Sequence, residues 1–103
     1  MDKETRKTVK WIAKKLKQKY RLERLVLFGS RARGDNFIHS DYDFIVVSND
    51  FKGKRFDERM AEVHGLWNKK EFIEPLCYTP EEFKEKKKTG IIRKALMEGI
   101  EIA

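Results

Sequence analysis

The chain of 103 residues has little of the chemistry that marks secreted, zinc-binding or membrane-embedded proteins. Its single cysteine, Cys77, cannot form an internal disulfide, and no Cys/His spacing suits zinc, which fits a reducing cytoplasm. No apolar run approaches the roughly 20 residues that cross a membrane, and the polar N-terminus is unlike a signal peptide. No repeat, low-complexity segment or linker is visible, so we expect one domain over residues 1–103.

Positive charge is what the chain has in excess. Lys and Arg number 24 against 17 Asp and Glu, which gives a net charge of +7, and hydrophobic residues make up 40%. That apolar share supports a modest core and is too high for a disordered chain. The excess charge favours a polyanionic partner, namely a nucleotide, a nucleic acid or an acidic protein face, although a solvated lysine-rich surface explains it equally well.

Apolar residues recur with helical and strand periods along the chain. Val9, Ile12 and Leu16 fall on one stripe, which predicts a helix over residues 3–20 with lysines on its solvated face. Apolar runs at about 24–28, 42–48 and 71–78 predict strands, and the last should lie at a sheet edge because Pro75 cannot donate a ladder hydrogen bond. We also expect helices over 56–68, 80–88 and 91–98, a short helix from about Ser30, and a small strand over 100–103.

The stretch Gly29-Ser30-Arg31-Ala32-Arg33-Gly34 follows the first predicted strand. Glycine lets the backbone approach a ligand closely, and a chain that turns from a strand into a helix points backbone N–H groups at one spot, which suits a phosphate. Ser30 adds a hydroxyl, while Arg31 and Arg33 add forked positive charge. We therefore expect Gly29, Ser30, Arg31 and Arg33 to bind a nucleotide. The loop is not a Walker A motif, because Asp35-Asn36 stand where Lys and Ser/Thr are required.

Two aspartates open the second predicted strand. Asp41 and Asp43 are two residues apart, so their carboxylates should project from the same face. Such a pair repels itself unless a cation lies between, and Mg²⁺ prefers carboxylate, water and phosphate oxygens. A phosphate-binding turn beside paired carboxylates is typical of phosphoryl transfer. His39, just before the aspartates, is expected to be an ordinary loop histidine.

Together these motifs resemble a known signature. Gly29-Ser30, ten intervening residues and then Asp41-x-Asp43 resemble the DNA polymerase β-like nucleotidyltransferase superfamily. The closer resemblance is to its minimal nucleotidyltransferase branch, small prokaryotic proteins often paired with HEPN-domain partners. It covers nearly the whole chain and implies an α/β (α+β) nucleotidyltransferase fold, a small mixed β-sheet with helices packed on one face and the site on the open face.

The resemblance also implies an activity and a set of site residues. It implies transfer of a nucleoside monophosphate, AMP from ATP, to a hydroxyl. Gly29 and Ser30 would hold the triphosphate, and Asp41 and Asp43 would bind two Mg²⁺ or Mn²⁺ ions. Glu74 matches the position of the family's third acidic residue, which completes the metal site and helps to activate the attacking hydroxyl. The family more often has Asp there, and Pro75 follows in this chain, so Glu71 stays open as the alternative third ligand.

The acceptor must come from outside the chain, which has no separate acceptor-binding domain. The resemblance implies a HEPN toxin adenylylated on a tyrosine, with this chain as the antitoxin. Two alternatives stay open: a nucleotide-binding module that masks its partner without chemistry, and a basic RNA-associated regulator. The aspartate pair argues against the first, because a non-catalytic module needs no metal pair. Salt-dependent RNA binding would support the second.

Overall fold

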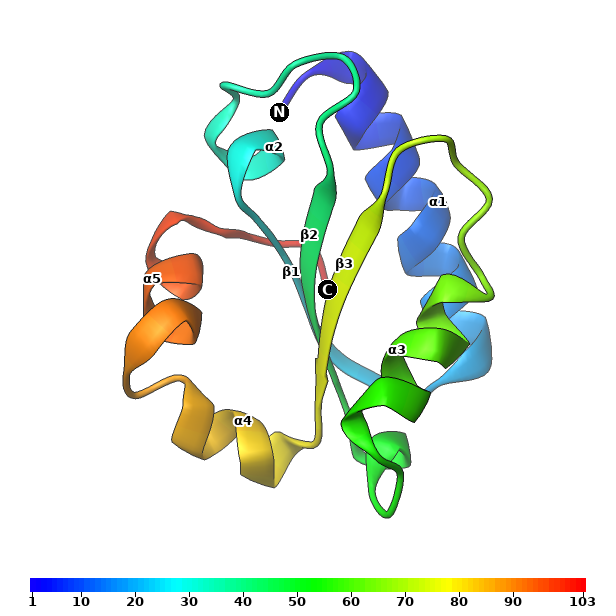
Figure 1. Cartoon of the computed structure of the whole chain (residues 1–103), viewed down its shortest axis with the longest axis vertical. Helices are drawn as coiled ribbons and strands as arrows, with labels where there is room; N and C mark the ends of the chain where they lie inside the picture. The colour runs from blue at the N-terminus through cyan, green and yellow to red at the C-terminus, as the bar shows by residue number, and fades with distance from the viewer.

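The two apolar runs that flank the Gly29-Ser30 turn form neighbouring strands in the middle of a sheet. The structure is a computed structural model that describes residues 1–103. Strand β1 (Leu22–Phe28) pairs antiparallel with β2 (Tyr42–Ser48). Strand β3 (Ile73–Tyr78) lies parallel to β2, and the two-residue β4 (Ile100–Glu101) lies antiparallel to β1. The sheet order β3-β2-β1-β4 confirms a small mixed sheet with the Pro75 strand at an edge (Figure 1).

Six helical segments connect and cover these strands. They are α1 (Lys3–Lys19), α2 (Ser30–Arg33), the short 3₁₀ helix η1 (Asn49–Phe51), α3 (Phe56–His64), α4 (Pro80–Lys86) and α5 (Gly90–Glu98). Helix α4 begins with a capping box, in which Thr79 and Glu82 each bond the other's backbone N–H. Helix α3 ends at His64, four residues earlier than predicted. The residues after Gly65 leave the helix so that Leu66 and Trp67 pack on the core.

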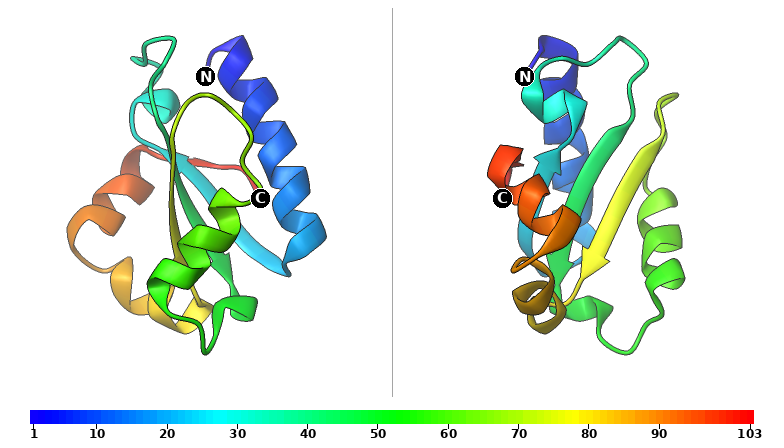
Figure 2. Two further views of the ribbon diagram at one scale, coloured as in Figure 1. Left: turned by 45° about the vertical axis from the view of Figure 1, so that its right-hand side comes forward. Right: turned by 60° about the vertical axis from the view of Figure 1, so that its left-hand side comes forward.

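Helices lie on both sides of the sheet (Figure 2). On one side, α1, η1 and α3 bury a core of 14 residues that includes Leu16, Phe44 and Val63. On the other side, α4 and α5 cover a smaller core of 7 residues built on Ile45, Val47 and their neighbours. The expected packing of helices on one face therefore holds for α1 and α3, whereas α4 and α5 cover part of the second face. None of the helices is both long and apolar enough to span a membrane.

Side-chain alternation along β2 separates the core from the exposed face. Tyr42, Phe44 and Val46 belong to the larger core, so Asp43 and Ile45 point to the opposite side. At the Ile45 end that opposite side is covered by α4 and α5. At the start of β2 it is uncovered, because Asp43 is half-buried and Asp41 is exposed. The sequence-predicted acidic residues therefore lie at the accessible end of the second face.

Candidate functional site

Gly29 holds the turn between β1 and the single-turn helix α2. Its backbone has φ +75° and ψ −159°, a combination open almost only to glycine. The Gly29 carbonyl accepts hydrogen bonds from the backbone N–H groups of Ala32 and Arg33, both at 3.1 Å, and Gly34 ends the helix in the left-handed region with φ +86°. The glycines therefore place Ser30, a half-buried residue, at the first position of α2.

The same glycine touches the aspartate strand. Phe28 is the register partner of Asp43, so the residue after it, Gly29, lies against the Asp43 side chain. A Cβ atom built on Gly29 would collide with Oδ2 of Asp43. Only glycine leaves space for the carboxylate here, and the predicted phosphate-binding turn and the predicted metal ligand are therefore in direct contact.

Asp43 and Glu74 form a close pair of carboxyl groups. Parallel pairing of β2 and β3 makes Glu74 the register partner of Asp43, so both side chains point to the same face. The pKa of Asp43 is raised from 3.8 to about 6, first by burial, then by its hydrogen bond with Glu74 and by repulsion from Glu74 and Asp41, and the positive charge of Arg33 opposes the shift. A cation bound here would relieve the repulsion between these carboxylates.

The donor set of this pair fits a hard divalent ion. Asp43, Glu74 and nearby Asp41 offer only carboxylate oxygens, the ligands that Mg²⁺ and Mn²⁺ prefer. No three His, Cys, Asp or Glu side chains are gathered closely enough to hold a metal by themselves. The protein therefore brings two carboxylates together, and a third, Asp41, lies near enough to act on Asp43 electrostatically. Phosphate and water oxygens would complete the coordination of an ion bound there.

Arg31 does not belong to the site, which corrects the sequence prediction that it binds nucleotide. Its side chain is 1% exposed, and its guanidinium carbon lies 4.1 Å from the centroid of the Tyr42 ring. Since Tyr42 belongs to the larger core, Arg31 lies on the opposite side of β2 from Asp43. A buried guanidinium under the strand cannot reach a phosphate on the other face.

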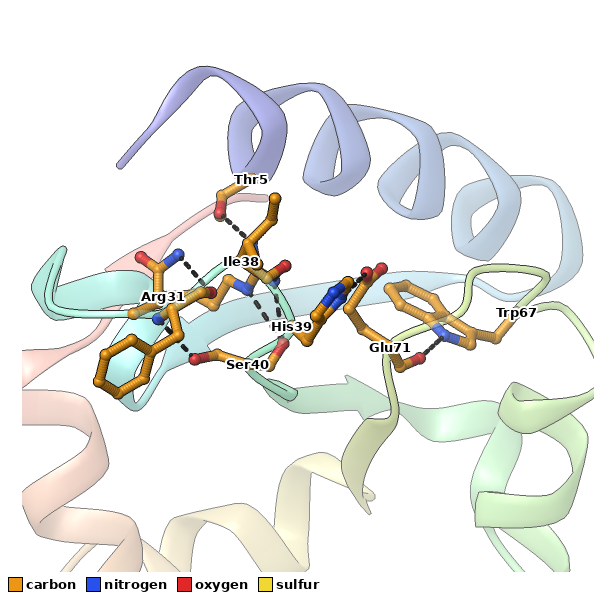
Figure 3. Close-up of polar contacts among 9 residues, drawn as sticks. Thr5, Arg31, Ile38, His39, Ser40, Trp67 and Glu71 are labelled. Atoms are coloured by element: carbon orange, nitrogen blue, oxygen red, sulfur yellow. Dashed lines mark hydrogen bonds and ion pairs between the residues drawn. The ribbon is translucent and has the colours of Figure 1, made fainter.

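Arg31 instead fixes the segment that precedes the aspartates (Figure 3). Its Nε and Nη2 donate to the Ser40 carbonyl at 3.2 and 3.0 Å, and Nη2 also donates to the Ile38 carbonyl at 3.1 Å. Its Nη1 donates to Thr5 Oγ1 on α1 at 2.8 Å. One side chain thus connects the single-turn helix after Gly29, α1 and the residue directly before Asp41.

Arg33 remains on the side of the carboxylates. Its guanidinium pairs with Asp35 at 3.1 Å and with Glu98 on α5 at 3.0 Å, and the side chain is 44% exposed. Its charge is felt at Asp43, whose pKa it lowers. Arg33 can therefore neutralise a phosphate at the turn if its two ion pairs break, and exposed ion pairs contribute little stability.

Glu71 and Glu74, the two candidates for the third acidic position, lie in different surroundings. Glu71 precedes β3, and its Oε2 lies 3.6 Å from Nδ1 of the exposed His39 (Figure 3). Its carbonyl accepts a hydrogen bond from Trp67 Nε1 at 2.7 Å. Glu74 instead lies beside Asp43. The geometry therefore favours Glu74, and it places the Glu71 carboxylate beside His39, which the sequence did not indicate.

Helix α5 supplies residues that sequence reasoning missed. A hollow of about 180 Å³ beside the turn is lined by Phe28, Gly29, Ile91, Lys94, Ala95 and Glu98. Lys94 brings a positive charge to the wall shared with Gly29. The spacing of α5 indicates a helix but not what it packs on, so no local signal could have found Lys94. The largest hollow, about 540 Å³ around Arg59 and Tyr78, contains none of the predicted site residues.

Comparison with known proteins identifies the family of this chain. Residues 9–102 match the nucleotidyltransferase domain family, and the chain belongs to that family. A candidate nucleotidyltransferase from Sulfolobus solfataricus, 23% identical, covers 94% of this chain and 80% of its own with a TM-score of 0.66. The BolA domain of SufE1 from Arabidopsis thaliana is 20% identical and covers 73% of this chain and 94% of its own, with a TM-score of 0.58. At these identities the two structures show a shared fold alone. No protein of curated function matches significantly.

Proposed function

We propose that this nucleotidyltransferase domain transfers AMP from ATP to a hydroxyl group of a protein partner. The observation that carries the proposal is the contact between Gly29 and Asp43, because it joins a phosphate-binding turn to a paired carboxylate site. Family membership supports a nucleoside triphosphate as the substrate. The choice of ATP comes from the resemblance to minimal nucleotidyltransferases.

Each site residue has a role in this reaction. The Gly29-Ser30 turn holds the triphosphate, and Arg33 and Lys94 offset its charge. Asp41, Asp43 and Glu74 would hold the two Mg²⁺ or Mn²⁺ ions, which when bound stabilise the leaving pyrophosphate and acidify the attacking hydroxyl.

The transfer exchanges one phosphorus–oxygen bond for another. The hydroxyl oxygen bonds to the α-phosphorus, and the bond from that phosphorus to the bridging oxygen breaks. Pyrophosphate leaves with the electron pair of the broken bond. In this proposal Glu74, which is exposed beside Asp43, accepts the hydroxyl proton.

The acceptor in this proposal is a macromolecule. Phe37 and Ile38, just before Asp41, are 83% and 79% exposed, and Phe72, two residues before Glu74, is 76% exposed. Exposed apolar side chains next to a reactive site are typical of a docking surface for a protein. We propose a HEPN-domain toxin as the partner, modified on a tyrosine in the cytoplasm, with this chain as its antitoxin. The phosphate added to the tyrosine would repel RNA from the toxin.

Mass spectrometry of the partner tests the proposal. The purified chain is incubated with a HEPN-domain protein encoded beside it, ATP and Mg²⁺, and the partner is weighed before and after. We expect steps of one AMP mass with the native chain and none with Asp41→Asn. A partner that stays unmodified but is inhibited in a stable complex would replace the enzyme with a masking module. A partner neither modified nor inhibited would remove the antitoxin role.

A further inference from the structure

Nearly all of the excess charge of the chain lies on one helix. Residues 2–20, which comprise α1 and its flanking residues, contain eight Lys or Arg against two acidic residues, and the rest contains sixteen against fifteen. Helix α1 packs its buried stripe, including Ile12 and Leu16, onto the larger core. The basic residues of α1 are all exposed: Lys3, Arg6, Lys7, Lys10, Lys14, Lys15, Lys17 and Lys19. The outer surface of α1, defined by these eight residues, is called the basic face below.

No ion pair within the chain neutralises this basic face. Every ion pair of the structure involves other residues, and none includes a side chain of α1. Several of the lysines stand three or four positions apart, as Lys10, Lys14 and Lys17 do, and like charges at that spacing destabilise a helix. A row of mutually repelling charges without internal partners is relieved by an external polyanion.

The basic face is hollowed as well as charged. A hollow of about 510 Å³ is lined by five residues of α1 and by Ile102 from the C-terminal segment. The residues of α1 are Lys10, Ala13, Lys14, Lys17 and Gln18. A second hollow of about 210 Å³ shares Lys14 and Gln18 with the first and is also lined by Trp11 and Lys15. Two grooves lined with ammonium groups can receive a chain of anions along the helix.

The composition of this face selects among polyanions. Seven of its eight cations are lysines, which are depleted in protein–protein interfaces but bind phosphate as point charges. No exposed aromatic side chain lies on α1 to stack unpaired bases: Trp11 is half-buried, and its ring packs against Trp67 and Lys69. A regular phosphate backbone therefore fits better than an acidic protein or a single strand.

We propose that the basic face of α1 docks on the phosphate backbone of duplex RNA. Duplex RNA is recognised mainly through its phosphates and 2′-hydroxyls, because its bases are hard to reach. The lysines supply the phosphate contacts. Gln18, the neutral polar side chain common to both hollows, can donate to or accept from a 2′-hydroxyl. This role is independent of the proposed transfer reaction.

The test compares two triple variants with the same net charge. Lys10, Lys14 and Lys17 are changed to Gln in one variant, and the exposed Lys52, Lys84 and Lys87 are changed to Gln in the control. Binding to a labelled RNA duplex of about 16–20 base pairs is followed by fluorescence anisotropy at about 50 and 200 mM salt. Each phosphate contact makes affinity fall about 3.5-fold between these salt concentrations.

The expected and contrary results are distinct. The α1 variant loses three phosphate contacts, so its fall in affinity between the two salt concentrations should be about 40-fold smaller than that of the native chain. The control variant should keep the native dependence of affinity on salt. The native chain should bind the RNA duplex more tightly than a DNA duplex or a single-stranded RNA of the same sequence, and Asp43→Asn should bind it normally. Equal losses in the two triple variants would overturn the assignment to α1. Equal or tighter binding of DNA or of the single strand would overturn the assignment to duplex RNA.

Discussion

Replacing Gly29 with alanine tests the contact on which the proposed site depends. At φ +75° and ψ −159° an alanine is strained by about 1–3 kcal/mol, a range that a domain of ordinary stability tolerates. The larger effect should be on chemistry, because the new Cβ collides with Oδ2 of Asp43 and must displace that carboxylate. A shift of about 1 Å in a catalytic group can cost roughly 100-fold in rate.

Gly34→Ala is the matched control. Gly34 also has a positive φ, +86°, but a Cβ built on it meets no atom within 4 Å. The control therefore carries about 1–2 kcal/mol of left-handed strain and no collision. Urea unfolding should show similar losses of stability in the two variants. Affinity for ATP with Mg²⁺, measured by calorimetry, should fall only in Gly29→Ala, and the rate of AMP transfer should fall about 100-fold in that variant alone. Native activity in that variant would refute the site.

Further predictions follow from the same geometry. Asp43→Asn should abolish transfer yet stabilise the metal-free protein at pH 7 by about 1 kcal/mol after discounting for solvent. Because its folded pKa is raised to about 6, Asp43 destabilises the fold as pH rises from about 4 to 6, so urea unfolding at pH 4 should show no gain. Glu74→Gln should lower the pKa of Asp43 in an NMR titration and stop transfer, whereas Glu71→Gln should do neither; the reverse would reassign the third acidic residue. Arg31→Lys should cost about 2–4 kcal/mol in urea unfolding, because one ammonium nitrogen cannot bond Thr5 Oγ1 and the two carbonyls as separate guanidinium nitrogens do, and full stability would mean that those bonds are dispensable.

Local signals in the sequence were sufficient to predict the central strands, the edge strand and the start of α4. The apolar runs before Gly29 and after Asp43 form β1 and β2, and the capping box at Thr79 starts α4. Pro75 correctly indicated an edge strand. These features depend on residues close together in the chain, and turn chemistry and side-chain alternation describe such neighbours well.

Other features of the site and the fold depend on long-range packing, which local sequence patterns do not show. Arg31 stands in a motif rich in phosphate-binding residue types, and only its place beneath Tyr42 shows that it is buried. Lys94 lines the same hollow as Gly29 because α5 packs against β1. The apolar spacing also predicted that α3 continues beyond Gly65. In the structure α3 ends at His64, because the packing of Trp67 on the core overrides the helical spacing.

The bonds made by Arg31 have a consequence for how the motif can vary among relatives. The distance in space from the Gly29-Ser30 turn to Asp41 is held by a side chain that donates hydrogen bonds to the carbonyls of Ile38 and Ser40. The number of residues between them does not set that distance, and the loop between Gly34 and Ile38 is exposed for most of its length. Insertions or deletions there would change the spacing in the sequence and leave the site intact. An arginine directly after Gly-Ser, with a polar α1 residue placed like Thr5, should therefore identify relatives that a fixed spacing would miss.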